Sequence, residues 1–145
     1  MNPERYEQLK QKAKEAKSRA FQRKVANDKE RIESSLFWAI KRVKEEARAD
    51  TWCTIHENCF RCSLEPAESD DHINKKFERF IHWRKFGAAV FVEVRWKNGS
   101  RSDLVICLNN GEIFIEEIAV SEKEENLLLK EEKYPFPIKV FRVKS

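Results

Sequence analysis

Three carboxylates stand in segments whose other residues are mostly apolar. Asp103 opens a predicted strand, SDLVICL, and Glu116 and Glu117 lie in the middle of the next predicted strand, EIFIEEIAV. Because alternate residues of a strand share a face, either glutamate is flanked by apolar neighbours. Burial of a lone ionised carboxylate is unfavourable by several kcal/mol, so such a glutamate needs a cation, a metal or a proton.

The two strands are separated by Asn109-Asn110-Gly111, which predicts a hairpin turn. Across this hairpin Asp103 can approach Glu117. Two carboxylates presented in this way suit Mg²⁺ or Mn²⁺, which activate water and neutralise phosphate charge. In the alternative interpretation, Asp103 is a turn residue and the two glutamates keep an edge strand soluble.

A second group of chemically active side chains has the spacing C-x2-H-x2-C-x2-C. Its members are Cys53, His56, Cys59 and Cys62. Thiolate and imidazole are the ligands that zinc prefers, so the group is a candidate structural Zn²⁺ site. On one continuous helix residues 53 and 62 would lie about 13 Å apart, so a shared ion requires a turn inside the motif. Disulfides, an iron–sulfur cluster and buried free thiols remain open.

The elements that must position these residues follow from periodicity and breakers. Residues 3–49 favour helix, either two helices or one long helix bent at Asn27-Asp28. The first half has a thin stripe of mostly alanine and is expected to stay exposed. The second half is expected to pack on the core through a richer stripe: Ile32, Leu36, Ile40, Val43 and Ala47.

The remainder of the chain predicts a helix, three strands, a second helix and a last strand. The first of these helices is expected to start at Ser69 or Asp70 and to end at Gly87. In the strand that follows, Val90, Val92, Val94 and Trp96 are expected on one face. Later elements are expected at about 102–108, 112–120, from Ser121 to Tyr134, and 137–143. We therefore predict three segments: a basic helical segment (1–50), a Cys/His connector (51–66) and an α/β core with a mixed sheet (67–145).

Charge and hydropathy narrow the functional class. The net charge of the 145-residue chain is +4, and residues 10–31 hold nine Lys/Arg against three Asp/Glu. Such a basic arm is typical of nucleic-acid contact, although a solvated helix face has the same composition. No apolar run is long enough for a membrane span and no signal segment is evident, so we expect a cytoplasmic, intracellular protein that is not secreted. The nucleic-acid-binding candidates are Lys10, Lys14, Lys17, Arg19, Arg23 and Lys24.

Three short motifs, in this order, resemble the PD-(D/E)XK nuclease superfamily, nearest to its competence-protein CoiA-like branch. The first is Glu68-Ser69-Asp70-Asp71-His72 with Lys76, the second is Arg101-Ser102-Asp103-Leu104-Val105, and the third is Glu117-Ile118-Ala119-Val120-Ser121. Such proteins often carry a Cys/His cluster before the helix. The likeness covers residues 53–143 and leaves the N-terminal helical segment unexplained.

The resemblance implies a restriction-endonuclease-like αβββαβ core. By the same likeness, Asp103 and Glu117 would hold Mg²⁺ or Mn²⁺ and Glu68 would contribute from the helix, directly or through water. His72 and Lys76 would support the substrate or the fold, and Lys76 joins the nucleic-acid-binding candidates. The signature lysine two positions after the glutamate is Ala119 here, and Lys123 is the predicted substitute.

The sequence therefore predicts a metal-dependent nuclease that hydrolyses phosphodiester bonds, and DNA rather than RNA is the expected substrate. One alternative is a catalytically inactive module that keeps the nuclease-like fold and binds nucleic acid. Another is a protein whose N-terminal helix pairs with a partner chain, a homodimer included.

Overall fold

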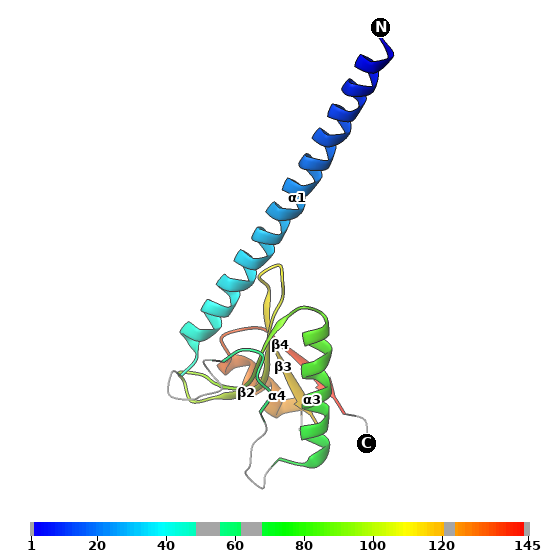
Figure 1. Cartoon of the computed structure of the whole chain (residues 1–145). Coiled ribbons are helices and arrows are strands. Elements are labelled where there is room, and N and C mark those ends of the chain that lie inside the picture. Colours follow the sequence, from blue (N-terminus) through cyan, green and yellow to red (C-terminus); the bar gives the residue numbers. More distant parts are fainter. Residues whose placement is uncertain (1, 49–55, 62–67, 121–123, 144–145) are drawn as a thin grey trace. The chain divides into compact units, whose positions relative to one another are not determined.

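The computed structural model describes residues 2–48, 56–61, 68–120 and 124–143, and it forms a mixed α/β fold with one open four-stranded sheet (Figure 1). The order of helices and strands agrees with the predicted order. The elements are α1 (Pro3–Glu46), α3 (Asp70–Lys85), β1 (Ala89–Arg95), β2 (Arg101–Cys107), β3 (Ile113–Ala119), α4 (Glu124–Lys133) and β4 (Ile138–Arg142).

The chain divides into two compact units, residues 1–34 and 35–145. The division falls inside α1, which runs without a break through Asn27 and Asp28, so the segment is one long helix and not two. Residues 2–27 are exposed, as expected from their thin apolar stripe. Within the ranges that the structure describes, no helix has an apolar stretch long enough to cross a membrane.

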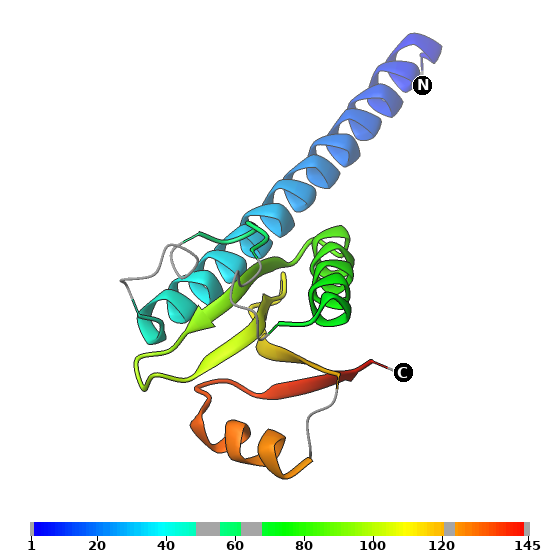
Figure 2. The ribbon, with the colours of Figure 1, turned by 90° about the horizontal axis from the view of Figure 1, so that it is seen from below.

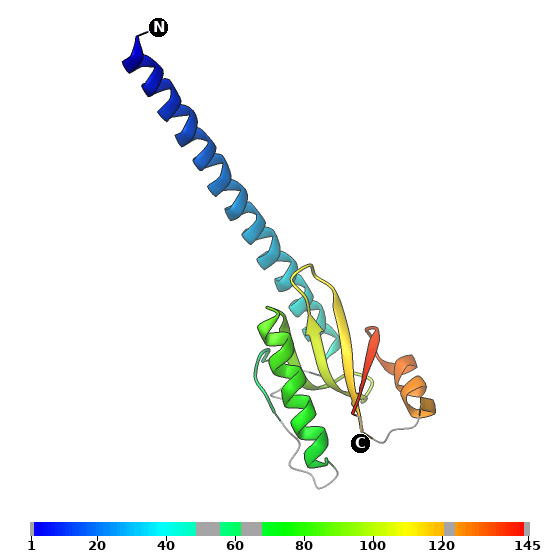
Figure 3. The same ribbon diagram turned by 90° about the vertical axis from the view of Figure 1, so that its right-hand side faces the viewer.

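The second unit is built on the sheet, whose strands lie in the order β1-β2-β3-β4. The first three strands form the predicted antiparallel meander, and β4 runs parallel to β3. Figures 2 and 3 show α3 over one face of the sheet and α4 on the other side. The parallel β4 requires the crossover through α4, which is why the chain needs a helix between its last two strands.

Two apolar clusters lie on the two faces of the sheet. One contains Val105 and Ile115 with the end of α1, where Leu36, Ile40, Val43 and Ala47 pack as predicted. Ile32, the first residue of that predicted stripe, is exposed instead. The other cluster holds α3 against the sheet and includes Phe80, Leu104, Ile106 and Ile118. The Ser69 side chain accepts a hydrogen bond from the His72 N–H and caps α3, as its sequence position predicts.

The prediction that Val90, Val92, Val94 and Trp96 share one face of the sheet is only half right. Val90 and Val92 face the α3 cluster, but Val94 and Trp96 belong to the opposite cluster. The change occurs at Glu93, whose φ of 54° is in the left-handed region that non-glycine residues rarely adopt. A conformation of this kind is unfavourable by about 1–3 kcal/mol, and it persists where surrounding contacts hold it. Here Lys76 of α3 donates a 2.8 Å hydrogen bond to the Glu93 carboxylate.

Glu116 and Glu117 are both buried, and β3 is an interior strand of the sheet. The interpretation of these glutamates as an edge-strand solubility device is therefore wrong. Glu116 faces α3, where Arg79 donates to both of its oxygens at 2.6 and 3.0 Å and the Trp83 ring N–H donates at 2.9 Å. Its charge is therefore matched inside the fold, which assigns Glu116 to structure.

The Glu116 ion pair yields a stability prediction. Arg79→Ala leaves a buried carboxylate without its cation, and the free energy of unfolding should fall by about 3 kcal/mol. The matched control is Lys85→Ala, which removes an exposed cation from the same helix and should cost less than about 0.5 kcal/mol. Urea unfolding of both variants measures the difference, and equal losses would contradict the assignment.

Candidate functional site

The carboxylates of Asp103 and Glu117 meet where the pairing of β2 with β3 ends. The last paired residues in that direction are Leu104 and Glu116. Beyond them the Ile118 N–H donates to Oδ2 of Asp103 at 2.9 Å, so a side-chain oxygen takes the place of a β2 carbonyl. The Asp103 side chain thereby lies against Glu117, and the two carboxyl groups are hydrogen-bonded. The predicted approach across the hairpin is present in the structure.

Two carboxyl groups this close do not both ionise. Glu117 is 2% exposed, and burial together with the neighbouring Asp103 charge raises its pKa to about 9. Burial also works to raise the pKa of Asp103, but hydrogen bonds from His72, Glu117 and the Ile118 N–H bring that pKa down to about 2. At neutral pH the two carboxyl groups therefore hold one proton between them, and Glu117 carries it.

Residues from the end of α4 surround Glu117 from the other side. The Tyr134 hydroxyl lies 2.7 Å from Oε1 of Glu117 and 2.6 Å from the carbonyl oxygen of Arg101. It thus ties the carboxyl group to the backbone of β2. The Lys130 ammonium lies 3.9 Å from Oε2 of Glu117, beyond hydrogen-bond distance. Lys130 works to lower the pKa of Glu117, but burial and Asp103 outweigh it.

On the α3 side, Asp103 is held by His72, whose Nε2 lies 3.4 Å from Oδ2 of Asp103. The other ring nitrogen, Nδ1, lies 2.7 Å from Oε1 of Glu68. The Asp103 hydrogen bond is the main cause that raises the pKa of His72, with a smaller contribution from Glu68, although burial opposes both. His72 thus sits between two carboxylates that stabilise its charged form.

Behind His72 lies a buried ion-pair cluster. Lys76 is fully buried and donates to Glu68 at 2.5 Å and to Glu93 at 2.8 Å. The prediction that Lys76 binds nucleic acid is therefore wrong, because its ammonium group has no access to a ligand outside the protein. Glu68, predicted to reach the metal directly or through water, contacts His72 and Lys76 and is linked to Asp103 through His72.

The position of the signature lysine is Ala119, which is buried at 3% exposure. The predicted substitute, Lys123, lies outside the described residues. Among the described residues it is Lys130, seven positions further on, whose ammonium group approaches Glu117.

Of the Cys/His cluster, only His56 and Cys59 lie in the described residues, while Cys53 and Cys62 fall outside them. Cys59 is a free thiol. Residues 56–61 pack beside β1, where Asn58 exchanges hydrogen bonds with the Val90 backbone and Phe60 contacts Phe77 and Phe80. In the part of the chain that the structure describes, no three His, Cys, Asp or Glu side chains form a group that could hold a metal ion.

Three residues of the site and its surroundings were not predicted from the sequence: Glu93, Lys130 and Tyr134. The last two lie four residues apart at the end of a helix, a spacing that places them on one face, and this was the available signal. For Glu93 the signal was a carboxylate inside an alternating apolar strand.

Comparison of the chain with protein families, with curated proteins and with solved structures finds no match. The assignment of a function therefore rests on the geometry of the site.

The shared proton predicts how stability depends on pH. The pKa of Glu117 is about 9 in the folded protein against an unperturbed 4.5, so the folded state keeps a proton that the unfolded chain releases. Between these values the free energy of unfolding should fall as pH rises, by up to about 1.4 kcal/mol per pH unit. His72, whose pKa is also raised, adds a loss of the same sign above its ordinary pKa of 6.5.

Urea unfolding across this pH range measures the slope. Glu117→Gln mimics the protonated acid, so this variant should keep only the His72 contribution and show a clearly shallower slope than the wild type. Parallel slopes in the two proteins would contradict the assignment of the proton to Glu117.

Proposed function

We propose that the protein is a metal-dependent nuclease that hydrolyses phosphodiester bonds through a site centred on Asp103 and Glu117. The observation that supports this proposal is the hydrogen-bonded carboxyl pair, in which Glu117 keeps a proton that a divalent cation would replace. A buried strand does not need two adjacent carboxylates for its stability. The two adjacent carboxylates instead form a site at which a cation is strongly stabilised.

The residues present fit Mg²⁺ or Mn²⁺ better than zinc. Mg²⁺ is commonly bound by one or two carboxylates, with its other positions filled by water and substrate phosphate. Asp103 and Glu117 supply two oxygen donors, while His72 is already engaged by Asp103 and Glu68. An ion bound by this pair would act as a Lewis acid that activates water and neutralises phosphate charge. The side chain of Asp103 is 19% exposed, so the pair is open to solvent on that side.

The fold is consistent with this assignment. The order α3-β1-β2-β3-α4-β4, with an antiparallel meander and a parallel fourth strand, matches the αβββαβ core that the resemblance implies. Asp103 is the third residue of β2, and Glu117 lies in β3. This agreement supports the restriction-endonuclease-like core as part of the proposal.

Three neighbouring residues have distinct parts in the proposal. Tyr134 holds one oxygen of Glu117 in place from the β2 backbone. His72 orients Asp103 by its Nε2 contact and is itself held by Glu68. Lys130 supplies the cation that Ala119 cannot, and it would stabilise negative charge that develops on a phosphate bound beside Glu117.

A specific observation favours a second candidate function. Ala119 replaces the signature lysine and is buried, so nothing at that position can orient an attacking water. If Lys130 does not compensate, the core is an inactive nucleic-acid-binding module that keeps the carboxyl pair.

The direct test is cleavage of DNA and RNA with Mg²⁺ or Mn²⁺. Asp103→Asn and Glu117→Gln should each reduce the rate by roughly 100-fold or more, since each removes one of the two metal-binding carboxylates. Glu112→Gln, an exposed carboxylate one residue before β3, is the control and should cut at the wild-type rate. Metal-dependent cutting that persists in both site variants would contradict the site.

Metal binding and the role of Lys130 are tested separately. Mn²⁺ at about ten times its dissociation constant should raise the unfolding temperature of the wild type by about 3–6 °C, and that of Asp103→Asn by much less. Lys130→Met should keep this thermal shift but lose about 10- to 100-fold in cleavage rate. A thermal shift without cleavage in the wild type would favour the inactive module, and no thermal shift would count against both functions.

A further inference from the structure

The exposed helix that precedes the core carries two rows of basic residues, one on each side of its alanine stripe. The stripe begins with Tyr6 and Leu9 and continues through Ala13, Ala16 and Ala20. Along one side the basic residues recur every seven positions, and along the other they recur with the same period. The first row is Lys10, Lys17, Lys24 and Arg31, and the second is Arg5, Lys12 and Arg19. At 3.6 residues per turn, a seven-residue period keeps each row on one side of a helix.

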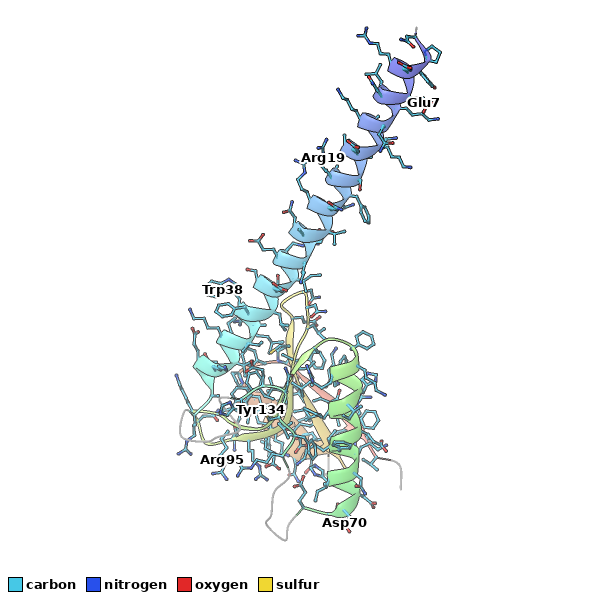
Figure 4. The ribbon with its side chains drawn as sticks, in the orientation of Figure 1. Glu7, Arg19, Trp38, Asp70, Arg95 and Tyr134 are labelled. Carbon is cyan, nitrogen blue, oxygen red and sulfur yellow. The ribbon has the colours of Figure 1, made fainter. Side chains whose placement is uncertain are left out.

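The acidic residues of this helix lie away from its alanine stripe, although Glu15 is a surface neighbour of Lys12 and Arg19. Up to residue 24 the acids are Glu4, Glu7 and Glu15, and all three lie on the opposite side of the helix. Figure 4 shows Glu7 and Arg19 projecting from different sides of α1. Residues 2–27 are exposed. Within the described residues, the six row members that precede Arg31 in the chain have no acidic partner. Arg31, the seventh member, lies 3.6 Å from Asp28, so the six others supply the positive charge that is open to a ligand.

This arrangement of charges excludes a second copy of the same helix as the binding partner of the alanine stripe. In a parallel pair each row would face the unlike row of the partner, and in an antiparallel pair each row would face its own copy. Both rows are basic, so like charges oppose in either case. The binding partner must carry negative charge along both sides of the surface that faces the alanine stripe.

We propose that this helix lies in the major groove of duplex DNA, with the alanine stripe facing the base edges and one basic row on each phosphate backbone. A helix with its side chains is about 10–12 Å in diameter, and the major groove of B-DNA is about 12 Å wide. Small side chains permit close approach to the groove floor. Arg23 and Asn27 continue the same side of the helix beyond the alanines, and these two residue types pair with guanine and adenine edges.

The stripe fits DNA better than an acidic protein helix. Helix pairing depends on large apolar residues at the contact positions, and here only Tyr6 and Leu9 are large, three positions are alanine and the next is Arg23. A-form RNA has a deep, narrow major groove that does not admit a helix. The inference rests on the proposed function in one respect: it names duplex DNA as the substrate class of the same nuclease.

The experiment is fluorescence anisotropy of the full chain with a labelled 20-base-pair DNA duplex, its single strand and a duplex RNA of the same sequence, all in EDTA. The DNA duplex should bind at least about tenfold more tightly than either other ligand. Because no divalent metal is present, the measurement does not depend on whether the core cuts. Failure here and failure of the proposed nuclease activity are therefore distinguishable.

A charge-matched pair of variants tests the rows. Lys10→Gln with Lys17→Gln removes two members of one row, whereas Lys29→Gln with Lys85→Gln removes two exposed cations that lie off both rows. The row variant should lose about tenfold in duplex affinity at low salt, and its salt slope should drop by about two phosphate contacts. The off-row variant should change affinity by less than about threefold.

Three results would overturn the inference. The first is an equal loss of duplex affinity in the two variants, and the second is binding of duplex RNA or single-stranded DNA as tight as that of the DNA duplex. The third is binding of a synthetic helix, with glutamates flanking an alanine–leucine stripe, that depends on the rows while binding of the DNA duplex does not. The last result would assign the helix to a protein partner.

Discussion

Inside a sheet, two carboxylates at hydrogen-bond distance are compatible with a stable fold only when a proton or a cation lies between them. Asp103 and Glu117 are in this position, and the protein without metal meets the constraint with one proton on Glu117. The opening between β2 and β3, the Ile118 N–H that turns to Asp103, and the Tyr134 hydroxyl that holds Glu117 all serve this pair. A site that keeps a proton at such a raised pKa is also one that a divalent cation can occupy by displacing it.

The second set of buried charges fixes α3 over the sheet. Lys76 binds Glu93 of β1 and Arg79 binds Glu116 of β3, so two ion pairs on one helix reach two different strands. Apolar contacts alone would permit α3 to slide along the sheet, whereas ion pairs of this kind accept only one register. We regard this as the reason that His72 meets Asp103, a hypothesis in line with buried polar groups that specify structure at a cost in stability.

Much of the core could be predicted from the sequence because its signals are local. Alternation gave β2 and β3, the Asn-Asn-Gly turn gave the hairpin, and together they placed Asp103 beside Glu117. The pairing of Glu116 with Arg79 was not evident, because it depends on which face of β3 meets α3, and that is a tertiary property. The switch of faces at Glu93 was missed because a positive φ in a valine-rich strand leaves no local mark.

Lys130 and Tyr134 were missed for a different reason. They are distant in sequence from Asp103, and only the crossover through α4 to β4 brings them to Glu117. Lys76 was misassigned because a lysine on a polar-looking helix gives no indication of burial between two carboxylates. The N-terminal helix was predicted well as an exposed basic element, since it forms few contacts that could override its composition.

The central claim is that Asp103 and Glu117 share a proton that a divalent metal replaces. It is tested most directly by carboxyl ¹³C NMR of the protein with labelled glutamate, titrated with and without Mg²⁺. Without metal, the Glu117 signal should titrate near pH 9. Saturating Mg²⁺ should shift that titration well below its metal-free midpoint, and Asp103→Asn should abolish the metal-induced shift. A Glu117 signal that titrates in the ordinary glutamate range, or one that does not respond to Mg²⁺, would contradict the account.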